Sequence, residues 1–63
     1  MRIVIHKKTG NVYSIVHDNV IECTNGREDR KYVVYQNEAG MLFCREAGEF
    51  WQKFDLAHLS QTI

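Results

Sequence analysis

The 63-residue sequence lacks the features that mark several large classes of protein. It has no stretch of about 18 consecutive apolar residues, so we expect no transmembrane helix and no membrane association. Its first ten residues, MRIVIHKKTG, contain an apolar run of three residues, far shorter than the apolar region of a signal peptide. These absences favour a chain that stays in the cytoplasm.

An excess of charge of one sign is also lacking, because eight Lys and Arg balance eight Asp and Glu. Zero formal net charge excludes a strong global attraction to nucleic acid or anionic lipid, although a local basic patch is still allowed. It also provides little electrostatic protection against self-association, so a homodimer is compatible with the sequence.

Cysteine and histidine are sparse and show no metal-binding spacing. Cys23 and Cys44 lie 21 positions apart, and a reducing compartment favours two buried or half-buried thiols over a disulfide. His6, His17 and His58 form no HxxxH pair, and none of them is closely spaced with a cysteine. Because structural zinc sites usually use such closely spaced pairs, we expect no metal site.

The motifs of the common enzyme classes are missing as well. The sequence has no nucleophile elbow, no glycine loop that could hold phosphate and no pair of catalytic carboxylates. A chain this short buries only roughly 60% of the surface of its unfolded form, which leaves little room for a dry active site. We therefore expect a non-enzymatic protein with no catalytic residues and no cofactor.

Alternating and β-branched segments predict a mainly β fold. Gly10 and the Asn25-Gly26 pair indicate chain reversals, and residues 18–19 indicate a tight turn or a bulge. The expected strands are 2–6, 12–17, 20–24, 31–36 and 41–45. Short strands joined by hairpins predict a partly open barrel or a curled antiparallel sheet of about five strands.

A short C-terminal helix is expected over residues 46–54, where the spacing changes. Phe50, Trp51 and Phe54 fall on one helical face, and we expect this face to be buried. Residues 1–54 would then form the folded core of a single domain, 1–63, and residues 55–63 a flexible tail.

Three segments resemble a small bacterial and phage family, the domain-of-unknown-function family numbered 1653. The segments are HKKTGNVYSIV, KYVVYQNEAGMLFCRE and EFWQKF, and they occur in that family's order. The matching positions are His6, Gly10, Tyr13, Val16, Val33, Tyr35, Leu42, Arg45 and Phe50.

The resemblance implies a small SH3-like, β-rich fold without established enzymatic activity. Two departures affect what it implies about function. IECTNGRED stands where the family has a segment like Arg-His-Ser-Glu-Thr, and Glu46 follows Arg45 where the family has proline.

Binding to another protein is the function that the sequence favours. Aromatic residues and arginine are enriched at interface hot spots, and Tyr13, Tyr35 and Arg45 are the candidate contacts. Arg45 at a strand end can instead be structural, bonding Glu46 or Glu49. The resemblance further implies that the chain is a bacterial or phage accessory protein that modulates a larger host protein.

Nucleic-acid binding is the alternative, since small β-barrels often bind through basic grooves and exposed aromatic rings. The basic candidates are Lys7, Lys8, Arg27, Arg30 and Lys31. Acidic residues interrupt the second group, so a solvated hairpin with mixed charges explains it equally well.

Overall fold

The computed structural model describes residues 2–24, 26 and 30–57, in which it contains five strands and one helix. In chain order these are β1 (Ile3–His6), β2 (Val12–Ile21), β3 (Lys31–Gln36), β4 (Leu42–Glu46), α1 (Ala47–Lys53) and β5 (Phe54–Leu56). All neighbouring strands are antiparallel, in the order β4-β3-β2-β1-β5. The predicted mainly β fold with one short helix is confirmed.

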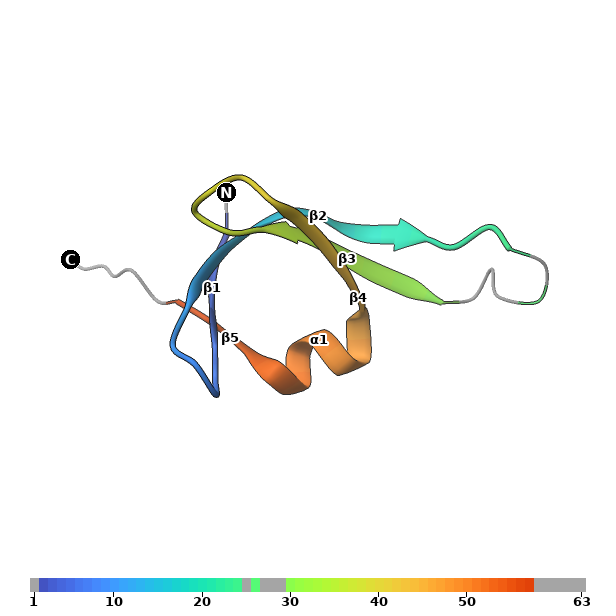
Figure 1. Cartoon of the computed structure of the whole chain (residues 1–63). Coiled ribbons are helices and arrows are strands. Elements are labelled where there is room, and N and C mark those ends of the chain that lie inside the picture. Colours follow the sequence, from blue (N-terminus) through green and yellow to red (C-terminus); the bar gives the residue numbers. More distant parts are fainter. Residues whose placement is uncertain (1, 25, 27–29, 58–63) are drawn as a thin grey trace.

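The sheet curls, and α1 spans the gap between its two edge strands, β4 and β5 (Figure 1). The inner face of the curled sheet and one face of α1 form the core. The core is small, as the chain length requires. Its buried residues are Val4, Ile15, Val33, Tyr35, Phe50 and Phe54.

β2 is longer than predicted and joins two of the expected strands. Residues 12–21 form one strand, so the expected strand 20–24 is correct for residues 20–21, which continue β2, and wrong for residues 22–24. Asp18 and Asn19 lie within β2, where the pairing with β3 shifts register between Ile15 and His17 and again between His17 and Val20. Such shifts are bulges, which let a strand continue past polar residues. Of the two alternatives for 18–19, the bulge is the correct one.

The fifth strand lies where a tail was expected. Asp55 and Leu56 belong to β5, which pairs with β1, and the Ala57 N–H donates to the Ile3 carbonyl at 2.9 Å. The boundary predicted at residue 54 is therefore wrong for residues 55–57. The reason is that the edge of β1 supplies the pairing, and a three-residue strand carries little signal of its own. Residues 58–63 are outside the described part of the chain.

α1 begins and ends one residue inside the predicted helix. Phe50 and Phe54 are buried and stack with ring centroids 4.3 Å apart, as expected. Trp51 is different, because 37% of it is exposed, although its ring contacts that of Phe50 with centroids 4.9 Å apart. Phe50 and Phe54 are one turn apart and share a face, whereas Trp51 is turned by about 100° from Phe50 around the helix axis. In the described residues no helix is long and apolar enough to cross a membrane.

Candidate interaction surfaces

Arg45 sits at the corner where β4 leads into α1, and two neighbours hold it. Its Nε–H donates to the hydroxyl of Tyr35 at 3.4 Å, and Nη1 bonds the Glu49 carboxylate at 3.2 Å. The hydrogen bond with Tyr35, and then the Glu49 charge, raise the pKa of Arg45 above its ordinary value against an opposing effect of burial. This geometry supports the structural role expected for Arg45, with Glu49 rather than Glu46 as its acidic partner.

Glu46 caps α1. Its carboxylate accepts a hydrogen bond from the Glu49 N–H at 3.1 Å, which satisfies one of the free N–H groups of the first helical turn. A Cβ atom on Gly48 would lie 3.3 Å from Glu46 Oε1. Glycine at position 48 therefore leaves room for the capping carboxylate, although glycine lowers intrinsic helix propensity.

The predicted partner-binding residues Tyr13, Tyr35 and Arg45 lie close together, but their exposure differs. The ring of Tyr35 is only 4% exposed and packs edge-on against Tyr13, with centroids 5.4 Å apart. Such burial removes Tyr35 from any contact surface, so its assignment as a contact residue is wrong. Tyr13 and Arg45 are half-buried.

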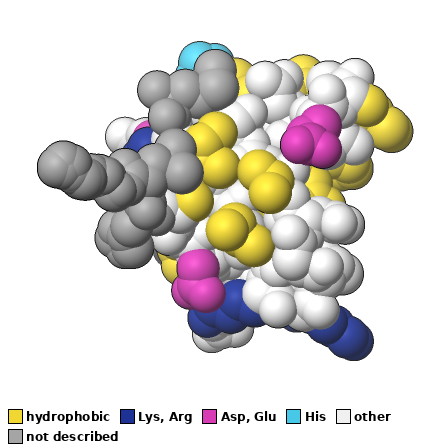
Figure 2. All heavy atoms as spheres, turned by 90° about the vertical axis from the view of Figure 1, so that its left-hand side faces the viewer, with side chains coloured by type: hydrophobic (Ala, Val, Ile, Leu, Met, Phe, Trp, Pro, Cys, Tyr) yellow, Lys and Arg dark blue, Asp and Glu magenta, His cyan; other side chains and the backbone are white. Residues whose placement is uncertain are grey.

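The outer face of the sheet carries apolar side chains at positions where an antiparallel sheet usually places polar ones. Val4 and Tyr13 face the core, so Ile3, Ile5 and Val12 point outward by the alternation of strands. We call these three residues the outer patch. Figure 2 shows hydrophobic side chains gathered on this side of the molecule, with acidic and basic groups around them.

The pairing of β1 with β2 brings the outer patch together. The His6 N–H donates to the Asn11 carbonyl at 2.9 Å, and the Ile15 N–H donates to the Arg2 carbonyl at 2.9 Å. Bonded and non-bonded pairs alternate in an antiparallel ladder, so Ile5 and Val12 form a non-hydrogen-bonded pair. Side chains in such pairs approach closely. Ile5 is 37% exposed and Val12 is 40% exposed.

Two hollows adjoin the outer patch beside the β3–β4 turn. One, of about 180 Å³, is lined by Ile3, Val12, Tyr13, Ser14, Gln36, Asn37 and Glu38. The other, of about 320 Å³, is lined by Asn11, Val12, Tyr13, Asn37, Glu38 and Ala39. Val12, Tyr13, Asn37 and Glu38 line both. The outer patch therefore continues into a depression with a polar rim, the usual composition of a protein-binding surface.

A second apolar depression lies on the outer face farther along the sheet. This groove of about 340 Å³ is lined by Val20, Glu22, Tyr32, Val34 and Cys44. The Tyr32 hydroxyl donates to Glu22 Oε1 at 2.8 Å across it. The groove extends the apolar character of the outer face from β2 to β4.

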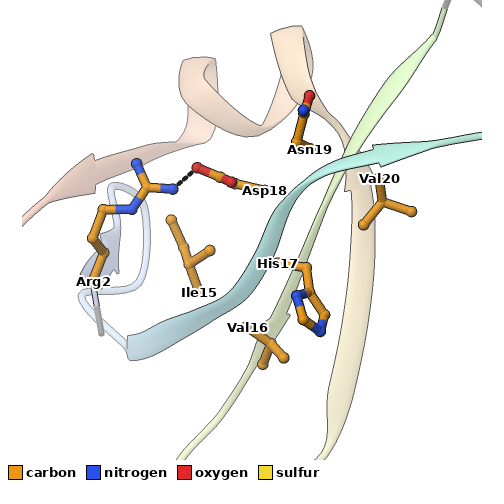
Figure 3. A pocket seen from close by; sticks show the side chains of 7 residues that line it. All are labelled: Arg2, Ile15, Val16, His17, Asp18, Asn19 and Val20. Carbon is orange, nitrogen blue, oxygen red and sulfur yellow. Dashed lines mark ion pairs between the residues drawn. The ribbon is translucent and has the colours of Figure 1, made fainter.

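A third hollow, of about 490 Å³, lies beside the part of β2 that β1 does not cover. An ion pair between Arg2 and Asp18 crosses it, and the side chains of Ile15, Val16 and His17 line it (Figure 3). The lining is mostly polar, which makes it less suited than the outer patch to an apolar partner.

The described members of the predicted basic set separate into two places. Lys7 and Lys8 lie in the β1–β2 turn, whereas Arg30 and Lys31 lie at the start of β3, on the arm that projects at the right of Figure 1. Arg27 is outside the described residues. The structure adds Lys53, whose carbonyl accepts the Lys7 N–H at 2.9 Å, and the sequence spacing gave no hint of this proximity.

Both cysteines are exposed and free, so the expectation of buried or half-buried thiols is wrong. Cys44 falls on the outer face because it pairs with Val34, and Cys23 lies beyond the end of β2. Among the described residues, no three His, Cys, Asp or Glu side chains form a group that could hold a metal ion. His58 lies outside the described part.

Comparisons of the chain with family models, curated proteins and solved structures gave no match. The resemblance to the family numbered 1653 therefore remains a prediction.

Proposed function

We propose that this chain is a non-enzymatic protein-interaction module that binds its partner through the outer patch. The observation that carries the proposal is the apolar character of a sheet face that none of the described elements covers. Exposed apolar patches with polar rims are typical of protein-binding surfaces. The outer patch and the two adjoining hollows meet that description, and Tyr13 is the originally expected contact residue that lines both hollows.

An SH3-like barrel is the more specific fold that we propose. Three features support it: β5 pairs with β1, β4 and β5 form the two edges of the sheet, and a short helix connects them. A bacterial or phage accessory protein acting on a larger host protein is the setting that the family resemblance adds. Two exposed free thiols favour a reducing compartment, which supports a cytoplasmic location.

Nucleic-acid binding is less well supported by the arrangement of the basic residues. The two groups of basic side chains lie on different parts of the sheet. Lys7 Nζ also lies 3.8 Å from the carboxylate oxygen Oδ1 of Asp55, which partly offsets its charge. A ring must be exposed to stack on a base, and Tyr35 is buried. Retention on heparin or DNA that falls steeply with salt would favour this alternative, because phosphate contacts release counterions.

Affinity capture with matched variants tests the proposal. Val12→Lys places a charge in the outer patch, and Gln52→Lys adds the same charge on the exposed side of α1. The wild type and Gln52→Lys should retain the same discrete protein from cell extract, whereas Val12→Lys should retain at least about ten-fold less, as truncation of an interface centre does. Equal capture by all three chains, or capture abolished by nuclease, would contradict the proposal.

A further inference from the structure

Three stretches of strand edge are unpaired in the described part of the chain, and two of them are protected. The edge of β2 beyond Ile15 contains two bulges and the Arg2–Asp18 ion pair. The edge of β5 is three residues long and includes Asp55. Bulges, charges and short length are the devices by which proteins prevent their edges from pairing with other chains.

The edge of β4 is less protected, because its two charged residues, Arg45 and Glu46, stand together at its C-terminal end. Leu42–Glu46 pairs with β3 residue for residue, without a register shift. The sequence contains no proline, and no lysine occurs in the strand. Met41 and Leu42 are more than 60% exposed, and Phe43 is 36% exposed. A regular edge whose first three residues, Leu42, Phe43 and Cys44, are apolar can add a strand from another molecule.

The β3–β4 turn determines which backbone groups face the open edge. The Asn37 N–H donates to the Met41 carbonyl at 3.1 Å, so these residues form a hydrogen-bonded pair. Bonded pairs recur at every second position of an antiparallel ladder, so Phe43 and Arg45 bond to β3. The backbone N–H and C=O groups of the alternate residue Cys44 therefore point away from β3, as do those of Leu42.

We propose that two copies of the chain pair β4 with β4 in antiparallel orientation, about a two-fold axis at Phe43. This register places the two Phe43 rings side by side and each Leu42 opposite Cys44 of the second copy. Aromatic and apolar cross-strand pairs of this kind stabilise a sheet. Zero net charge removes the general repulsion between the two copies.

Other positions of the axis are less favourable. An axis at Arg45 places two guanidinium groups opposite each other, and like charges in that position are destabilising. An axis at Cys44 places Leu42 against the carboxylate of Glu46. An axis at Leu42 leaves most of β4 unpaired. Pairing of β4 with β5 of the next copy matches five residues with three and generates rings or open filaments instead of a dimer.

The dimer uses a different surface from the outer patch, so it goes beyond the proposed function and can fail independently of it. The test compares Cys44→Pro with Cys44→Ser by analytical ultracentrifugation, with circular dichroism as the check on folding. Proline at position 44 removes only the N–H that faces the open edge, and the extended Phe43 before it suits proline. Serine keeps that N–H.

The wild type and Cys44→Ser should sediment as dimers, and Cys44→Pro should raise the dissociation constant at least about ten-fold by removing two hydrogen bonds per dimer. Leu42→Lys, at a position that is 62% exposed in the single chain, should weaken the dimer without affecting folding. A wild type that remains monomeric, a larger oligomer, or a dimer that neither variant weakens would overturn the proposal.

Cross-linking tests the position of the axis, with Cys23→Ser present throughout. Under mild oxidation with diamide, Leu42→Cys should form covalent dimers between the introduced thiol and Cys44 of the second copy. Without Leu42→Cys, no covalent dimer should form, because the Cα atoms of the two Cys44 residues would be diagonal neighbours about 7–8 Å apart, too far for a disulfide. Covalent dimers through Cys44 alone would contradict the axis at Phe43.

Discussion

Arg45 of β4 donates a hydrogen bond of 3.4 Å to the hydroxyl of Tyr35 on β3, whose ring is 4% exposed. The guanidinium thus satisfies a polar group at the margin of an otherwise apolar core. The same side chain reaches Glu49 on α1, which links the sheet to the helix.

Arg45→Met should lower the free energy of unfolding by about 1–2 kcal/mol, because it leaves the Tyr35 hydroxyl without this partner. Tyr35→Phe in the same background should recover part of the loss, since the unpaired hydroxyl is then absent. Glu49→Gln should cost less than about 1 kcal/mol, as expected for an exposed ion pair. Urea unfolding of the single and double variants measures these differences. An Arg45→Met variant with an unchanged free energy of unfolding would contradict the structural role of Arg45.

Glu46 and Gly48 should show coupled effects on stability. Glu46→Ala should cost about 1 kcal/mol through loss of the helix cap. Gly48→Ala should gain little in the wild type because the new Cβ crowds the capping carboxylate. In the Glu46→Ala background, the same change should gain up to about 1 kcal/mol, the full difference in helix propensity. Equal effects of Gly48→Ala in both backgrounds would argue against crowding.

Substitution of the two neighbouring aromatic residues of α1 should have very different effects on stability. Phe50 is fully buried, so Phe50→Ala should cost about 3–5 kcal/mol, enough to unfold a small domain. Trp51→Ala should leave the chain folded, because much of that side chain is already exposed. Thermal unfolding followed by circular dichroism distinguishes the two. If Trp51→Ala were as damaging as Phe50→Ala, the placement of α1 on the sheet would be incorrect.

Both thiols should react in the folded protein. Because Cys23 and Cys44 are exposed, a thiol reagent should modify both without denaturant, at rates within about ten-fold of free cysteine at the same pH. Cys23→Ser and Cys44→Ser assign each rate to its residue. The rate for Cys44 should be measured at low protein concentration, because the proposed dimer would cover this residue and dissociates on dilution. Reaction that requires urea would mean that the thiols are buried.

The sequence was informative wherever the structure depends on local signals. The periodicity of Phe50 and Phe54 predicted α1, and β-branched, apolar or alternating segments predicted β1, β3 and β4. It was less informative wherever pairing with a distant segment decides the outcome. β5 exists because β1 offers an edge, and β2 continues through Asp18 because a bulge absorbs the extra residues.

The candidate site was also only partly predictable from the sequence. Sequence composition favoured aromatic residues as contacts, but three of them, Tyr35, Phe50 and Phe54, fill the core. The outer patch consists of Ile3, Ile5 and Val12, ordinary β-branched residues whose direction depends on register. A one-residue change in register would turn each of them inward, so composition alone could not select them.

Methyl NMR of the chain, with and without its captured partner, tests the binding surface most directly. Ile5 and Val12 lie in the outer patch, Ile21 lies at the far end of β2, and Val33 is buried in the core. We predict that the methyl signals of Ile5 and Val12 shift or broaden on binding, whereas those of Ile21 and Val33 remain unchanged. Shifts confined to Ile21, with Ile5 and Val12 unaffected, would contradict binding through the outer patch.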